Sequence, residues 1–188
     1  MRYIILLLVF VSFSLAQPLS LGKPNEEKEH SSWLNLGIGL GALGPMNTSY
    51  KQQGKKFFNP SLLASIQFAE LTAVTLEFDM TMSDGGLGGW VGLEQQILKT
   101  DVTPFVEIQV GARDPGHDKR DSLKFGDVFG VATSLNTGVI FFRESSFRLR
   151  LKGGYERIFN EVPDMSWNLE INLFFALGKP GLKTIKVN

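Results

Sequence analysis

Cysteine is absent from the chain of 188 residues, and histidine occurs only at His30 and His117. Without cysteine there can be no disulfide bond, thiolate metal site, thiol nucleophile or lipidated N-terminal cysteine. His117 is accompanied by carboxylates that lack the spacing of a ligand set. We therefore expect a solvated loop around His117, no metal site and no cofactor.

The chain also lacks an excess of charge of either sign, because 19 basic residues balance 19 acidic residues. A nucleic-acid-binding protein needs a basic surface that neutralises phosphates, so nucleic acid is not an expected partner. Glycine and phenylalanine are abundant instead, with 20 and 15 residues. This composition, with few segments of helical period, favours β-sheet.

A long apolar run occurs only at the N-terminus, where it starts after Arg2 and stops at Ser14-Leu15-Ala16. It is shorter than the roughly 20 residues that a membrane-spanning helix needs, and its small residues fit a signal-peptidase site. We expect residues 1–16 to be a cleaved signal peptide, with an uncleaved anchor helix as the alternative. Residues 17–32 are expected to be a flexible leader, and a mature protein that enters a membrane must do so as strands.

Apolar side chains recur at every second position in eight segments of the chain. In the clearest segment Val74, Leu76 and Phe78 alternate with polar residues such as Glu77. A strand places such residues on one side, whereas a helix would scatter them. Each segment has close to or more than the roughly 9–11 residues of a tilted membrane strand. The segments are residues 33–43, 60–69, 72–82, 87–98, 102–113, 126–142, 146–157 and 165–177.

The links between these segments alternate in length. The pattern predicts that the first, third and fifth links are longer than the second, fourth and sixth. Outer-membrane β-barrels show this asymmetry, with short periplasmic turns and longer outer loops. The longer links include residues 44–59, 83–86 and 114–125, and the shorter ones lie at residues 70–71, 100–101 and 143–145.

The polar face of the segments carries both glycine and paired charges. In a narrow eight-stranded barrel, small inner residues make room for large ones, and opposite charges can offset the cost of burying each other. We expect a structural charge network that plugs the lumen; a conducting path is the alternative. Its members are Glu77, Asp79, Glu94, Glu107, Arg113, Arg148, Arg150, Lys152, Glu156 and Glu170.

Aromatic residues gather near the ends of the segments, as expected for two girdles where lipid meets water. Trp90 is an exception, because its position in the alternation points inward. In a lipocalin-like barrel, by contrast, the apolar face would line a cavity. One predicted girdle contains Trp33, Phe105, Phe141, Phe142 and Phe147, and the other contains Phe57, Phe58, Phe129, Phe159 and Trp167.

Catalytic motifs are weak. Gly39 to Gly44 matches the spacing of a dinucleotide-binding loop, but that loop must open a helix and here Pro45 follows. We expect lumen-facing glycines at these positions. Ser–His–acid catalysis needs serine and histidine together at one rim, whereas His30 lies in the leader and His117 in a loop. No catalytic residues and no enzymatic activity are expected.

From residue 33 to residue 177 the chain resembles the small eight-stranded outer-membrane barrels of the OmpA and OmpX type. The most specific elements are Pro104-Phe105-Val106, with Gly111 further along, and a last segment that ends in Phe175. Residues 178–188 form a short C-terminal tail. This tail is far too short for the peptidoglycan-binding domain of complete OmpA proteins.

The last segment also resembles the signal read by the barrel-assembly machinery. Asn168 supplies its polar start, and Leu173 and Phe175 are its closing hydrophobic residues. Glu170 departs from the pattern, since that signal usually has glycine there. The tail beyond the terminal aromatic residue is a second departure.

Together, the pattern and the resemblance predict an all-β protein, an eight-stranded antiparallel up-and-down transmembrane β-barrel. It is expected to be a monomer in a bacterial outer membrane, in contact with membrane lipid and lipopolysaccharide and inserted by the barrel-assembly machinery. A non-enzymatic structural or surface-interaction role follows, with an unknown ligand at the outer loops, residues 44–59 and 114–125. The alternatives are a secreted lipocalin-like carrier of an apolar ligand, a narrow pore and a lipid-modifying barrel enzyme.

Overall fold

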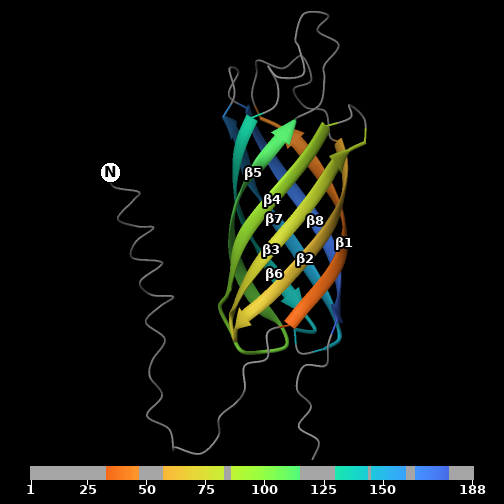
Figure 1. The fold of residues 1–188 in the computed structure, drawn as a ribbon, viewed down its shortest axis with the longest axis vertical. Helices are drawn as coiled ribbons and strands as arrows, with labels where there is room; N and C mark the ends of the chain where they lie inside the picture. The colour runs from red at the N-terminus through yellow and green to blue at the C-terminus, as the bar shows by residue number, and fades with distance from the viewer. Residues whose placement is uncertain are drawn as a thin grey trace, which may run out of the picture.

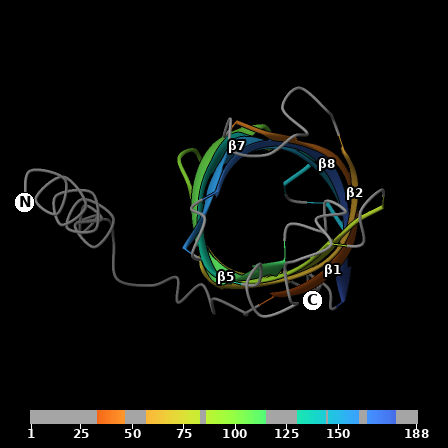
Figure 2. The same ribbon diagram turned by 90° about the horizontal axis from the view of Figure 1, so that it is seen from above.

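A computed structural model describes residues 33–46, 57–82, 86–114, 130–143, 145–159 and 164–177. Eight antiparallel strands pair in sequence order, and β8 pairs with β1, so the sheet closes into a barrel without an open edge (Figures 1 and 2). This confirms the predicted all-β, eight-stranded up-and-down barrel. The strands are β1 (Trp33–Pro45), β2 (Phe57–Ala69), β3 (Thr72–Thr81), β4 (Gly86–Gln96), β5 (Thr103–Asp114), β6 (Gly130–Phe141), β7 (Phe147–Phe159) and β8 (Asp164–Leu177).

The barrel has two ends, which we name by their links. The second, fourth and sixth links meet at the turn end, and the other four links meet at the loop end (Figure 1). The predicted difference in length is wrong for the third link, residues 82–85. This link is shorter than both the fourth, residues 97–102, and the sixth, residues 142–146. Ile97 continues the apolar alternation in sequence and the apolar Leu98 follows it, but β4 ends before both residues. Their amides instead bind Pro104 O and Thr103 Oγ1, at 2.9 and 3.0 Å, and so close the turn.

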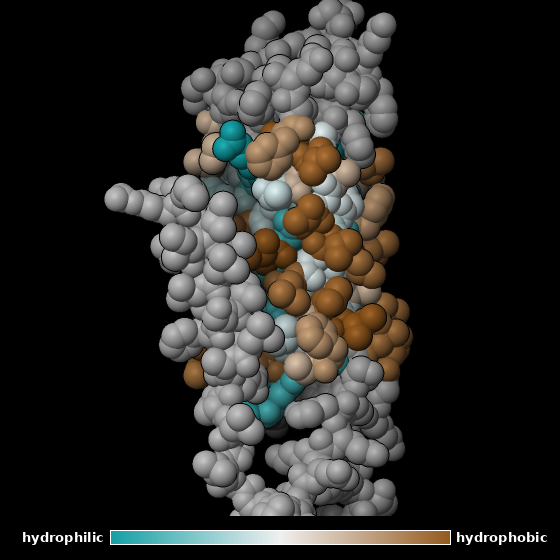
Figure 3. All heavy atoms as spheres, turned by 60° about the vertical axis from the view of Figure 1, so that its left-hand side comes forward, coloured by the Kyte–Doolittle hydropathy of each residue, from teal (hydrophilic) through white to brown (hydrophobic). Residues whose placement is uncertain are grey.

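Burial alternates along most of each strand, because successive side chains point to opposite faces of a sheet. In β4 inward positions are buried and outward positions are mostly exposed from Gly86 to Gln96. The outward face is apolar, and Leu62 and Leu169 are 63% and 61% exposed. On the face seen in Figure 3, apolar side chains cover much of the barrel wall that the grey atoms leave visible. Apolar residues therefore lie outside and polar residues inside.

Among the side chains that the structure describes, three aromatic ones point into the lumen, the interior of the barrel. Each is directly opposite a glycine on a neighbouring strand. A Cβ at Gly37 or Gly138 would clash with the ring opposite, and a Cβ at Gly111 would clash with the backbone of β4. A lumen closed by only eight strands is just wide enough to be filled by side chains, so these glycines accommodate the large rings. The cross-strand pairs are Trp90–Gly111, Phe105–Gly138 and Phe174–Gly37.

The girdle prediction is wrong for Phe105, which is fully buried inside the lumen. Phe105 shares its face with Glu107, and this parity, rather than its place near a strand end, decides its direction. Phe58 and Phe159 at the loop end, and Phe142 and Phe147 at the turn end, are exposed on the outside. Trp90 points inward, as its position in the alternation predicts.

Several predicted features lie outside the described residues: the signal peptide, the leader, the tail, Phe129, His30, His117 and most of the two long outer loops. The side chains of Trp33 and Phe57 are not described either. The glycines of the dinucleotide-like motif belong to β1, which is a strand and not the start of a helix. Within the described ranges no helix is long and apolar enough to cross a membrane.

Candidate functional site

The lumen holds the charged residues that the alternation singles out. All ten side chains lie on the inner face, and none is more than 5% exposed. Most of them form three groups along the barrel axis, and in each group one cation lies between two carboxylates. The cations are Arg113, Lys152 and Arg150, in order from the loop end to the turn end.

The loop-end group is centred on Arg113 of β5. Its Nη1 lies 3.0 Å from Asp79 Oδ2 and 3.2 Å from Glu156 Oε2, while Nη2 donates to Thr81 Oγ1 at 3.2 Å. Trp90 Nε1 donates a second hydrogen bond to Asp79 Oδ2, at 2.7 Å. The guanidinium also lies 5.9 Å from the centre of the Trp90 ring. One arginine thus ties together strands β3, β4, β5 and β7.

The middle group is centred on Lys152 of β7. Its Nζ lies 2.6 Å from Glu77 Oε2 on β3 and 3.1 Å from Glu170 Oε2 on β8. Gln109 Nε2 donates to the same Glu77 oxygen at 2.9 Å. Strands β3 and β7 lie on opposite sides of an eight-stranded ring. The Lys152–Glu77 ion pair therefore crosses the whole lumen, and the lumen is closed at this level.

The turn-end group contains two like charges side by side. Glu94 of β4 and Glu107 of β5 are direct cross-strand partners, an arrangement that destabilises a sheet unless a cation intervenes. Arg150 supplies that cation: it forms an ion pair with Glu107, and its Nε lies 3.5 Å from Glu94 Oε2. Its guanidinium also lies 4.6 Å from the ring centre of Phe105, in a cation–π contact.

Arg143, in the link between β6 and β7, is a lumen-closing residue that the sequence pattern does not reveal. Phe142 has a φ of 58°, in the left-handed region, and is exposed on the outside. The next side chain, Arg143, is buried and donates from Nε to Gln96 Oε1 at 2.7 Å and from Nη2 to Glu70 O at 2.5 Å. The break in alternation at Phe141-Phe142 is the only signal of this change in direction.

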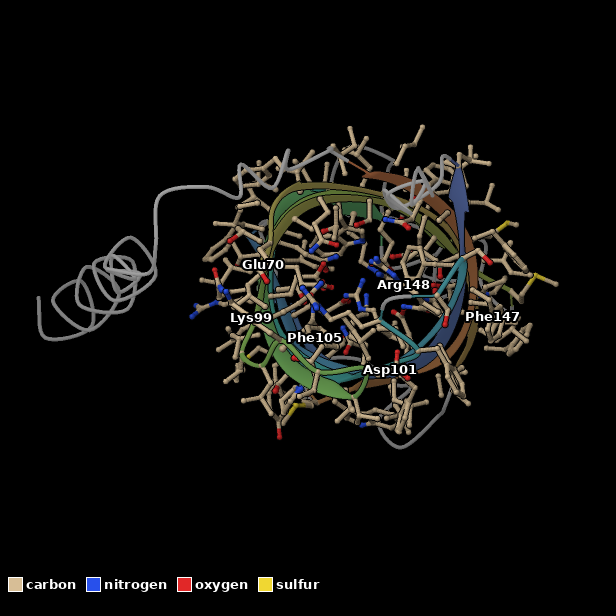
Figure 4. The ribbon with its side chains drawn as sticks, turned by 90° about the horizontal axis from the view of Figure 1, so that it is seen from below. Glu70, Lys99, Asp101, Phe105, Phe147 and Arg148 are labelled. Atoms are coloured by element: carbon tan, nitrogen blue, oxygen red, sulfur yellow. The ribbon has the colours of Figure 1, made fainter. Side chains whose placement is uncertain are left out.

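Figure 4 shows this end of the barrel from below. Arg148 and Phe105 lie within the ring of strands, whereas Phe147 lies outside it. Arg148 Nη1 donates to Gln67 Oε1 at 3.3 Å. Lys99 and Glu70 lie at the periphery of the turn end and form an exposed ion pair of 2.6 Å. The charges of the lumen are thus buried, whereas this ion pair at the turn end is exposed to water.

The described lumen residues take part in ion pairing and packing. The part of the chain that the structure describes contains no histidine and no cluster of three residues that could hold a metal ion. Neutral side chains complete the network where charges do not meet. Thr75 Oγ1 donates to Glu107 Oε1 at 2.6 Å, and Asn136 Nδ2 donates to Gln109 Oε1 at 3.0 Å. These neutral partners are not predicted by the sequence pattern.

No protein-family model matches the sequence, and no curated protein matches it either. Among solved structures, the N-terminal β-barrel domain of OprF from Pseudomonas aeruginosa is similar, with a TM-score of 0.54 and 9% identity over 77% of this chain and 100% of that chain. Neisserial surface protein A has a TM-score of 0.50 and 14% identity over 77% of this chain and 96% of that chain. The chain has the fold of the small outer-membrane β-barrels. The resemblance predicted from the sequence is thus confirmed.

The residues of the predicted assembly signal lie on both faces of β8. Asn168 points into the lumen and donates from Nδ2 to Asn136 Oδ1 at 3.1 Å. Leu173 and Phe175 point outward. The ring of Phe175 lies 5.8 Å from that of Phe147 on β7, so the last strand is packed against its neighbour at the turn end.

Proposed function

We propose that the protein is an integral barrel of a bacterial outer membrane, with a closed lumen and a structural or surface-interaction role rather than a catalytic one. The observation that carries this proposal is the arrangement of the two faces. Large apolar residues such as Ile38, Ile171 and Val91 are more than half exposed on the outside, while charges fill the inside. A soluble protein rarely exposes such a continuous apolar surface, but acyl chains would cover it.

The height of the apolar band also supports a location in an outer membrane. The shortest strand, β3, has 10 residues, and a strand of that length extends about 33 Å at about 3.3 Å per residue. With the tilt of about 40° that is usual in such barrels, it covers about 25 Å of membrane thickness. This equals the height of the apolar band of outer-membrane barrels.

The residues at the two ends of the barrel support a position across the membrane, with each end at one boundary between lipid and water. Exposed aromatic residues occur at the loop end, with Phe58 and Phe159, and at the turn end, with Phe142 and Phe147. Beyond them the turn end carries exposed polar groups, including the Lys99–Glu70 ion pair. Aromatic belts followed by charged residues are typical of the boundary between lipid and water. We assign the short turns to the periplasmic side.

A closed lumen places the expected interactions at the surface. The Lys152–Glu77 pair blocks a direct path, so we infer that specificity resides in the loop-end links, within residues 44–59 and 114–125. The other expected partners are outer-membrane lipid, lipopolysaccharide and, during insertion, the barrel-assembly machinery. A lipocalin-like carrier is disfavoured, because the described inner face is lined by ion pairs rather than by an apolar cavity.

Cell fractionation tests the location. We expect the full-length protein to stay with the outer membrane, to be released only by detergent, to migrate differently on gels before and after heating, and to have lost residues 1–16. The absence of native cysteine allows single labels: Ile108→Cys should react slowly with a membrane-impermeant maleimide, and Thr100→Cys rapidly. A protein that is soluble without detergent and fully labelled at position 108 would overturn the proposal.

A further inference from the structure

One charged side chain interrupts the apolar outer face of the barrel. Arg157 of β7 is the only exposed charged residue at an outward position of the described strands, since Asp114, at the loop end of β5, is buried. β7 runs from the turn end to the loop end and finishes at Phe159. Arg157 therefore lies close to the loop end, at the level of the aromatic residues there.

The surroundings of Arg157 provide no counter-charge among the described residues. Its guanidinium contacts a ring instead and lies 5.2 Å from the centre of Phe159. Its cross-strand partners are Thr133 on β6 and Met165 on β8. A guanidinium on a membrane-facing wall needs an anion from outside the chain or contact with water, because unpaired charge is costly beside acyl chains.

Polar and aromatic groups gather around this arginine. Thr133 is directly opposite Arg157 and half-buried, so a residue with a hydroxyl group and a cationic residue occupy neighbouring positions on the outer wall. Two positions nearer the barrel centre, Tyr155 is 58% exposed and directly opposite Trp167. The patch thus combines a planar cation, a hydroxyl group and three aromatic rings, counting Phe159.

This combination matches one class of membrane component. Arginine binds a phosphate through two parallel hydrogen bonds, and aromatic rings with one polar edge settle at the level of lipid headgroups. A headgroup that offers both a phosphate and a sugar ring beside acyl chains would occupy every part of the patch. Because the loop end faces outward in the proposed orientation, the available lipids are those of the outer leaflet.

We propose that Arg157, Thr133, Tyr155 and Trp167 form a binding site for a phosphorylated, acylated glycolipid of the outer leaflet. Arg157 binds the phosphate, Thr133 donates a hydrogen bond to the headgroup, and Tyr155 and Trp167 pack against the sugar and the first carbons of the acyl chains. This inference rests on the proposed membrane location. It assigns a defined lipid contact to one side of the barrel, on β6, β7 and β8.

Native mass spectrometry of the refolded full-length barrel in detergent tests the site with three lipids: bis-phosphorylated lipid A, the same lipid after enzymatic removal of its phosphates, and phosphatidylglycerol. We expect the phosphorylated lipid A complex to persist and the other two lipids to bind at least tenfold more weakly. Arg157→Gln should weaken lipid A binding about tenfold. Arg157→Lys should retain part of the affinity, because lysine binds phosphate only as a point charge.

Lys99→Gln is the matched control, because it removes one exposed cation at the opposite end and should leave lipid A binding unchanged. Heat-dependent gel migration shows that each variant has folded. Equal binding of dephosphorylated lipid A, or unchanged binding by Arg157→Gln, would overturn the site. Equal binding of phosphatidylglycerol would also overturn it. These results concern a barrel that has already folded in detergent, so they are distinct from a failure of the membrane assignment.

Discussion

Lys152 and Glu77 lie on opposite walls of the barrel, and yet the lysine Nζ is 2.6 Å from the glutamate Oε2. Two side chains thus meet at the centre of a lumen that eight strands enclose. Glu170 lies 3.1 Å from the same Nζ, so the cation is held between two carboxylates. Buried ion pairs of this kind depend on both partners, because removing one leaves the other charged and without compensation.

Replacing Lys152 with methionine should therefore destabilise the barrel strongly. Glu77 and Glu170 would remain buried without their cation, and we expect the free energy of unfolding to fall by about 3–5 kcal/mol. Urea unfolding in lipid vesicles measures this change. The control is Lys99→Met, which breaks an ion pair whose side chains are 57% and 36% exposed and should cost less than about 1 kcal/mol. Similar losses for both variants would contradict the structural role of the lumen pair.

The lumen should not conduct ions in the resting protein. Arg113 joins β3, β5 and β7 at the loop end, and Arg150 joins β4, β5 and β7 at the turn end. We expect the wild-type protein in planar bilayers to show no stable ohmic channels. The Glu77→Ala/Lys152→Ala variant should also stay closed, because both other levels remain. Sustained channel currents from the wild-type protein would favour the narrow-pore alternative.

The outer face should tolerate charge at the rim and reject it near the centre. Ile171 lies midway along β8 and is 53% exposed, and Leu177, at the turn end of the same strand, is equally exposed. Ile171→Arg is expected to cost about 2–4 kcal/mol and Leu177→Arg about 0–1 kcal/mol in vesicles. Both are measured by unfolding from the same lipid. Equal costs at the two positions would show that the barrel does not sit in the bilayer as proposed.

Glycine should be required inside the barrel and replaceable outside it. A Cβ at Gly138 would clash with the backbone oxygen of Leu151 and the ring of Phe105, whereas a Cβ at Gly89 would have no atom within 4 Å. We expect Gly138→Ala to lower the unfolding free energy by about 1–3 kcal/mol. Gly89→Ala should raise it by about 0.5–1 kcal/mol, because alanine restricts the unfolded chain. The result would contradict the packing of the lumen if Gly138→Ala were as stable as wild type.

Most of the fold can be predicted from the alternation of apolar and polar residues. A period of two identifies each strand and assigns its faces, because side-chain direction in a strand depends on parity alone. The same rule places Phe105 beside Glu107 inside the lumen. Its position near a rim suggests a girdle residue, but parity decides the direction of its side chain. The predicted fourth segment extends to Ile97 and Leu98, which belong to a turn, because the alternation of apolar residues does not show where the pairing of two strands stops.

The partners across the lumen could not be predicted in the same way. Neighbouring strands have a register that turns and patterns fix, but Lys152 and Glu77 lie on strands that never pair. Their approach depends on the stagger and tilt of the whole barrel. The inward direction of Arg143 has a local cause that the pattern does not contain. The left-handed backbone at Phe142 turns the following side chain inward, and phenylalanine is not a residue type that predicts this conformation.

The pairing of β1 with β8, in which Leu34 lies opposite Leu177, has a consequence for how the protein reaches its native state. The strand made first and the strand made last share a ladder, so the ring cannot close before the whole barrel sequence is available. Contacts this distant in sequence form slowly. Until the ring closes, the apolar residues of the strands in the seven other pairings are exposed and can aggregate. The unfolded chain must therefore be protected during its transit, and we expect its insertion to be a late, concerted event.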